Sequence, residues 1–159
     1  MSWLHSRPFG IWILVVIFGW RCLKSLELLT RGDRVTDSVL FRLIDAGYMH
    51  SALLVAILVA HAAALWGLFR PAPVWFWVAV VALSLWVAEH IIAHVAALRH
   101  PEQAREAFRI SRISRGLHAP EGALDLAVNP TLSLVLLLVC LALSVIWFVL
   151  LVSNRSHFL

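Results

Sequence analysis

Side chains that bind metals and exchange protons are grouped at the end of one long apolar run. The stretch WVAEHIIAHVAALRH, residues 86–100, contains Glu89, His90, His94 and His100. His90 and His94 are four residues apart, so on a helix they share one face. Imidazoles placed in this way are common ligands of haem iron and of divalent metals. The pattern therefore raises two hypotheses, a cofactor site or the polar rim of a membrane helix.

A fourth histidine from the preceding apolar run extends this group. The sequence RPAP divides two apolar runs near Ala72, and its prolines favour a turn. His50 and His94 are each twenty-two residues from Ala72, so an antiparallel hairpin places them at similar depth. The candidate haem or metal ligands are therefore His50, His90 and His94. The HIIAH segment matches an HxxxH box, but the chain has neither further His-rich boxes nor an HExxH motif.

His61 lies near the middle of the same apolar run. A polar side chain at that depth is costly unless it finds a partner. We favour a hydrogen bond to Ser84, which the hairpin places at a similar depth. The alternative is ligation of a haem or of a chlorophyll magnesium, and the identity of any cofactor stays open.

Arg21 and Glu89 form a second candidate pair. Each is nine residues from the same end of its apolar run, which corresponds to a depth of about 13 Å at 1.5 Å per residue. Unpaired charges at this depth are expensive, so we predict an intramembrane ion pair. We favour a structural role, a latch between two helices. The alternatives are snorkelling of Arg21, proton transfer and substrate binding.

The elements that position these residues are predicted to be membrane helices. Of the 159 residues, 62% are hydrophobic and only 14% are charged, which is unlike a soluble domain. Apolar runs of about 18 residues or more can cross the hydrocarbon layer. We predict an all-α polytopic protein, a single membrane domain over residues 1–159. Its four predicted spans are 9–29, 48–69, 74–98 and 132–152.

The connectors carry most of the positive charge. Arg7, Arg70 and Arg155 lie on one side of the four predicted spans, and the other ten of the thirteen cations lie on the opposite side. The richer side is expected to be cytoplasmic. Loops 30–47 and 99–130 are then cytoplasmic and both termini are outside, in a bacterial inner membrane. Cations gathered mainly in the connectors in this way indicate orientation rather than nucleic-acid binding.

The surface segment 99–130 is predicted to contain an amphipathic helix between the third and fourth spans. Its apolar positions are expected to lie at the headgroup boundary while its arginines reach anionic lipid. A solvated helix is the equally weighted alternative. The candidate lipid-binding residues are Arg105, Arg109, Arg112 and Arg115.

Small residues recur along the second predicted span. Residues of this kind allow close helix approach within a bundle or against a partner protein. The predicted helix-packing residues are Ala52, Ala56, Ala60, Ala64 and Gly67.

Two stretches carry a resemblance to known proteins. The opening RPFGIWILVVIFGW and the hairpin ALWGLFRPAPVWFWVAVVALSL resemble small four-span bacterial membrane proteins of unknown function. The resemblance implies no activity and no functional residues.

The sequence favours a non-catalytic function. It has no P-loop, no nucleophile beside a plausible base and no large domain outside the predicted spans. We expect an accessory or scaffold subunit of a larger membrane complex, respiratory or photosynthetic, that binds lipids and other membrane subunits. Two alternatives stay open: a haem- or metal-binding redox protein using His50, His90 and His94, and a small oligomeric transporter using Arg21 and Glu89.

Overall fold

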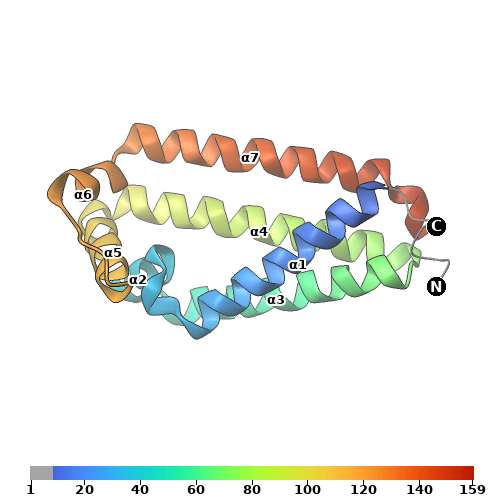
Figure 1. Ribbon diagram of the computed structural model, residues 1–159, viewed down its shortest axis with the longest axis horizontal. Coiled ribbons are helices and arrows are strands. Elements are labelled where there is room, and N and C mark those ends of the chain that lie inside the picture. Colours follow the sequence, from blue (N-terminus) through green and yellow to red (C-terminus); the bar gives the residue numbers. More distant parts are fainter. Residues whose placement is uncertain (1–8) are drawn as a thin grey trace.

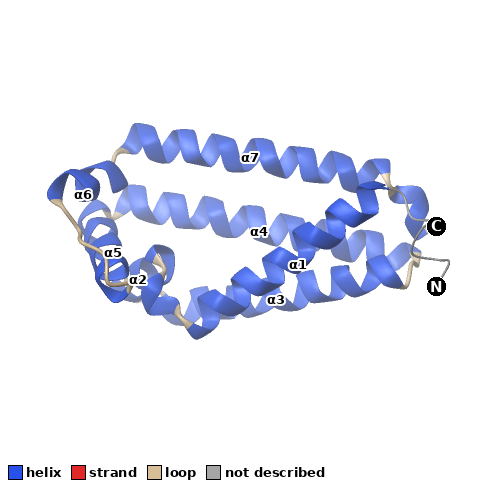
Figure 2. Ribbon diagram, viewed as in Figure 1, coloured by secondary structure: helices blue, strands red, loops and turns tan. Residues whose placement is uncertain are grey.

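Four long apolar helices dominate the structure, a computed structural model that describes residues 9–159 and only the backbone of Asp33. The part of the chain it describes is all-helical (Figures 1 and 2). The four long helices are apolar enough to cross a membrane, and each ends within two residues of the predicted bounds. They are α1 (Phe9–Thr30), α3 (Gly47–Phe69), α4 (Pro73–Arg99) and α7 (Pro130–Ser153). Arg7 of the orientation argument lies outside the described residues.

The helix boundaries follow local sequence signals. The RPAP turn separates α3 from α4, and Pro73 occupies the first turn of α4, where a missing N–H costs nothing. Asn129 caps α7, because its side-chain oxygen accepts hydrogen bonds from the backbone N–H groups of Thr131 at 2.9 Å and Leu132 at 3.1 Å. The turn at RPAP was predicted from the sequence and is confirmed.

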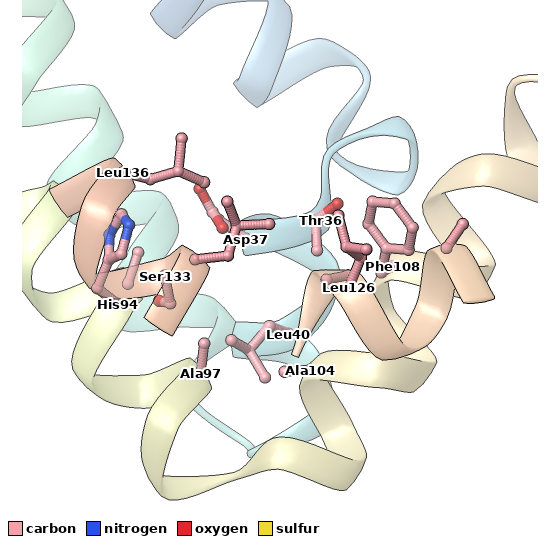
Figure 3. Close-up of a pocket in the computed structure, with 14 residues that line it drawn as sticks. Thr36, Asp37, Leu40, His94, Ala97, Ala104, Phe108, Leu126, Ser133 and Leu136 are labelled. Atoms are coloured by element: carbon pink, nitrogen blue, oxygen red, sulfur yellow. The ribbon is translucent and has the colours of Figure 1, made fainter. Parts of the chain in front are cut away.

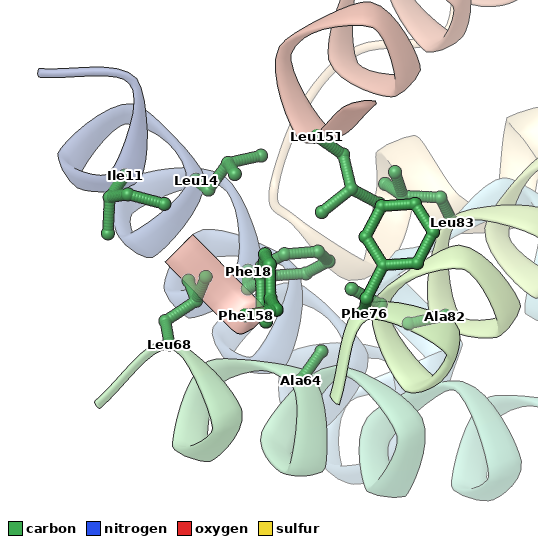
Figure 4. Close-up of a cluster of buried hydrophobic side chains, with 11 residues drawn as sticks. Ile11, Leu14, Phe18, Ala64, Leu68, Phe76, Ala82, Leu83, Leu151 and Phe158 are labelled. Carbon is green, nitrogen blue, oxygen red and sulfur yellow. The ribbon is translucent and has the colours of Figure 1, made fainter. Parts of the chain in front are cut away.

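Each long helix packs against the next long helix along the chain. Helix α1 packs on α3, α3 on α4 and α4 on α7. Helix α1 crosses the bundle obliquely and also meets α7 near the chain end (Figure 1). There the side chains of Phe18, Leu68, Phe76 and Phe158 form part of one buried apolar cluster (Figure 4). Lipid is as apolar as these side chains, so close packing rather than escape from water stabilises their contacts.

The shorter helices gather at the opposite end of the bundle, which we call the polar end (Figure 1). Its elements are the 3₁₀ turn η2 (Gly32–Arg34) and the helices α2 (Thr36–Leu43), α5 (Pro101–Ser114) and α6 (Glu121–Ala127). Val39, Leu40 and Phe41 of α2 are buried against alanines of α4 and α5. Helix α2 therefore packs as a plug over the ends of the long helices.

Helix α5 packs mainly on α2. Its buried face consists of Ala104, Ala107 and Ser111, whose small side chains allow the two helices to approach closely. Ile113, a larger apolar residue of the same helix, is 56% exposed. The segment predicted as one surface helix thus contains two, and α5 uses its smallest residues to bind the rest of the protein.

The predicted small-residue stripe on α3 divides into two halves. Ala64 and Gly67 are buried near the α3–α4 turn, and Ala60 is half-buried. Ala52 and Ala56, nearer the polar end, are exposed. The first half therefore packs within the bundle, and the second half is left on its surface.

Candidate functional site

Glu89 is the centre of a buried polar cluster at the polar end. It is only 5% exposed. Its Oε1 atom lies 3.6 Å from Nε2 of His50, and its Oε2 atom lies 2.8 Å from Nδ1 of His90. The carboxylate therefore lies between one imidazole from α3 and one from α4, within hydrogen-bond distance of His90 but not of His50.

Packing fixes the orientation of both rings. His50 stacks on Phe41 of α2 with 4.3 Å between ring centroids. His90 meets the indole of Trp86 edge-on at 4.8 Å. The α2 plug and the aromatic face of α4 thus hold the two imidazoles against Glu89.

Arg21 approaches this cluster from α1. Its guanidinium lies over the ring of Trp86, 4.6 Å from the centroid, and within electrostatic range of Glu89. The described residues contain no direct ion pair involving Arg21. The residues predicted to pair thus lie in one site, but the charge of Arg21 reaches Glu89 without a salt bridge.

The three candidate ligand histidines border three different cavities. His94 lines a cavity of about 400 Å³ that is enclosed by α2, α4, α5, α6 and α7 (Figure 3). His90 and His50 each line a separate one. Within residues 9–159, no group of three or more His, Cys, Asp or Glu side chains is spaced to hold a metal ion. Ligation of a haem or metal by His50, His90 or His94 stays a prediction.

His61 of α3 is fully buried and does not bond to Ser84. Its Nδ1 atom lies 2.8 Å from the carbonyl oxygen of Ile57, and its ring meets Phe18 edge-on. Ser84 donates instead to the carbonyl of Val80 at 2.9 Å and is exposed. The predicted His61–Ser84 hydrogen bond is therefore wrong, because Ser84 lies on another face of α4.

The arginines of α5 are largely engaged within the protein. Arg105 pairs with Glu121 and Asp125, and Arg109 with Glu106 at 2.6 Å. The bond between Arg109 and Glu106 holds the pKa of Glu106 below its usual value and raises the pKa of Arg109. The other two predicted lipid-binding arginines make hydrogen bonds to backbone oxygens, Arg112 to His118 and Arg115 to Ser111. Their binding to headgroups stays a prediction.

Asp37 belongs to the site, although sequence reasoning did not select it. Protein encloses most of its side chain at the start of α2. Burial first, and then the nearby Glu89 carboxylate, raise the pKa of Asp37 above its usual value near 3.8, while the three surrounding histidines partly oppose this. Its signal was weak, because a single acidic residue in a short connector is usually solvated.

Asp37→Asn is expected to stabilise the protein at neutral pH. Because the pKa of Asp37 is raised in the folded state, its contribution is most favourable below about pH 3.8 and is lost as the pH rises through the folded-state value. The amide is always uncharged and avoids this loss. The thermal midpoint in detergent should therefore be higher for the variant at pH 7, and the two midpoints should converge toward pH 3.5.

Asp45→Asn removes the same charge from an exposed position and controls for the change in net charge. A difference between Asp37→Asn and wild type that is the same at both pH values would contradict the explanation.

Comparisons with protein-family models, curated proteins and solved structures find no match to this chain. The resemblance to small four-span bacterial proteins stays a prediction.

Proposed function

We propose that the chain is a non-catalytic accessory or scaffold subunit of a larger bacterial membrane assembly, binding partner helices and lipid. The observation that supports this most strongly is the exposure of α7. Of its 24 residues, Leu151 is the only one buried within the described chain. Helix α7 packs along α4 but touches α1 only near one end. A helix added to one edge of a bundle in this way is suited to a second partner on its free side.

The groove between α4 and α7 is the best candidate for the contact. It encloses about 450 Å³ and is lined by Ser84 and Ala88 of α4 and by Ser144, Val145 and Phe148 of α7, among others. The hydroxyls of Ser84 and Ser144 bond to their own helices, so the groove wall is apolar. Small residues on the wall allow a transmembrane helix to approach closely, and van der Waals packing would then stabilise association.

Val145→Trp tests the proposal. Val145 lines the groove and is 63% exposed. The indole should fill the groove and remove a partner polypeptide that copurifies in constant ratio with the wild-type chain under mild detergent. Val16→Trp is the matched control, because Val16 on α1 is 68% exposed and should accept the same change.

Two outcomes would count against this contact. Equal recovery of the partner with both variants would place the contact elsewhere on the chain. Recovery of the wild-type chain without any second polypeptide would reject the accessory role.

The orientation of the protein is part of the proposal. We infer that the polar end is cytoplasmic and that α5 is the cytoplasmic helix between the third and fourth spans. The excess of cations in its connectors supports this. The α3–α4 turn and the C-terminal 3₁₀ turn, η3 (Arg155–Phe158), share the opposite end (Figure 1). A periplasm-active reporter fused after Leu159 should be active, and the same reporter inserted after Leu117 should be inactive; the reverse pattern would contradict the orientation.

A further inference from the structure

A polar cavity opens between α1, the η2–α2 segment, α4 and α5. It encloses about 560 Å³. Its wall runs from Arg31, directly after α1, to Arg21 of α1. Glu89 and His90 border the same cavity, so it extends from the polar end to the buried cluster.

Positive charge predominates on the cavity wall. Among the described residues that line it, five are permanently cationic and three are carboxylates, with His90 in addition. The cations are Arg21, Lys24, Arg31, Arg34 and Arg115, and the carboxylates are Glu27, Asp37 and Glu89.

Two of the carboxylates are already engaged by other groups. Glu27 forms an ion pair with Lys24 at 2.7 Å on the exposed side of α1. Glu89 is flanked by His50 and His90. In the part of the chain that the structure describes, no carboxylate pairs with Arg31, Arg34 or Arg115. These three guanidinium groups therefore retain their charge for an additional partner.

A buried serine, Ser111, lines the cavity and connects two of its cationic residues through hydrogen bonds. The hydroxyl of Ser111 donates to the carbonyl oxygen of Arg34 at 3.0 Å and accepts from Nη2 of Arg115 at 3.3 Å. Thr36 also donates to this hydroxyl. Ser111 thus joins the backbone that carries Arg34 to the side chain of Arg115, which keeps two cationic residues on one side of the opening.

The inner end of the cavity is also cationic. Arg21 lines it beside Glu89 and His90, and the described chain gives Arg21 no ion pair. The positive charge therefore extends along the whole cavity.

We propose that this cavity binds a phosphate group, carried either by an anionic phospholipid headgroup or by a soluble phosphorylated molecule. Several guanidinium groups around one polar space match the oxygens of phosphate, which arginine recognises through paired hydrogen bonds. Basic pockets beside membrane helices recognise anionic headgroups by the same chemistry. The proposal does not depend on the accessory role, because it concerns a different surface from the α4–α7 groove.

The test uses the full chain in phosphatidylcholine nanodiscs, with the thermal midpoint as the readout. One arm adds inorganic phosphate, with chloride at equal ionic strength as its control. The other arm replaces part of the phosphatidylcholine by phosphatidylglycerol. The double variant Arg34→Gln/Arg115→Gln removes two charges from outside the long helices. The matched double variant Arg42→Gln/Arg99→Gln removes two charges from exposed positions that do not line the cavity.

We expect stabilisation of the wild type in at least one arm. A response to phosphate assigns a soluble ligand, and a response to phosphatidylglycerol alone assigns a headgroup. The Arg34→Gln/Arg115→Gln variant should need about tenfold more of the active anion for the same shift, since it loses two charged hydrogen-bonding groups. The Arg42→Gln/Arg99→Gln variant should respond as the wild type does. Equal responses from the two double variants, or no response of the wild type in either arm, would overturn the proposal.

Discussion

Glu89→Leu is expected to destabilise the protein by about 3–5 kcal/mol, the usual cost of removing one partner from a buried charge cluster. The substitution removes the carboxylate that lies between His50 and His90. It also leaves Arg21, which has no direct ion pair in the described chain, without its nearby negative charge. Unfolding in mixed detergent, followed by circular dichroism, measures the loss.

Two further variants separate charge from packing at this position. Glu89→Gln keeps the size of the side chain and an oxygen acceptor near His90, so its loss should be smaller than that of Glu89→Leu. Arg21→Met combined with Glu89→Leu removes both charges, and replacing a buried ionic group by apolar side chains is often neutral. The double variant should therefore recover most of the stability, and strict additivity of the two single losses would show that Arg21 and Glu89 are not coupled.

Gly67→Ala is expected to cost about 1–3 kcal/mol through overpacking. A Cβ atom at Gly67 would lie 2.5 Å from both Cβ and Cγ of Trp75. These atoms are close to the backbone and cannot move away by a simple side-chain rotation. The turn between α3 and α4 would have to open, which should lower the thermal midpoint and increase proteolysis near Arg70.

Gly19→Ala is the control for this substitution. A Cβ atom at Gly19 would meet nothing within 4 Å, and alanine favours the helix over glycine by up to about 1 kcal/mol. The control should therefore be neutral or slightly stabilising. Similar losses for both variants would show that α3 and α4 do not approach as closely as described.

The long helices were predictable because each has a signal strong enough to stand alone. Apolar runs of membrane length fix the four helices, prolines fix the α3–α4 turn, and Asn129 marks the start of α7. These signals act within a few neighbouring residues, so the sequence specifies them without knowledge of the tertiary structure.

The polar end was less predictable, because distant contacts stabilise its elements. Helix α2 has only eight residues, too few to be stable alone, and it depends on packing against α3 and α5. The same contacts enclose Asp37. A connector of this length carries no sequence signal for a short packed helix. The sequence therefore predicts no helix over residues 36–43.

The sequence predicted the approximate depth of the site residues along their helices, but not the rotation of each helix about its own axis. Counting residues from the turn placed His50 level with His94, whereas the structure brings His50 to within 3.6 Å of Glu89, which lies five residues nearer the turn than His94. The same counting could not show which face of α4 each residue occupies. For this reason His94 borders a different cavity, and Ser84 does not reach His61. Helix rotation is set by packing, which spacing along the chain does not reveal.

The central claim is that this chain works as part of a larger membrane assembly. Native mass spectrometry of the wild-type chain, released from its own membranes in a mild detergent, tests it most directly. We predict a complex that contains the 17.8 kDa chain together with at least one different polypeptide in fixed stoichiometry. A spectrum that contains only the chain or its homo-oligomers, with or without bound lipid, would contradict the claim.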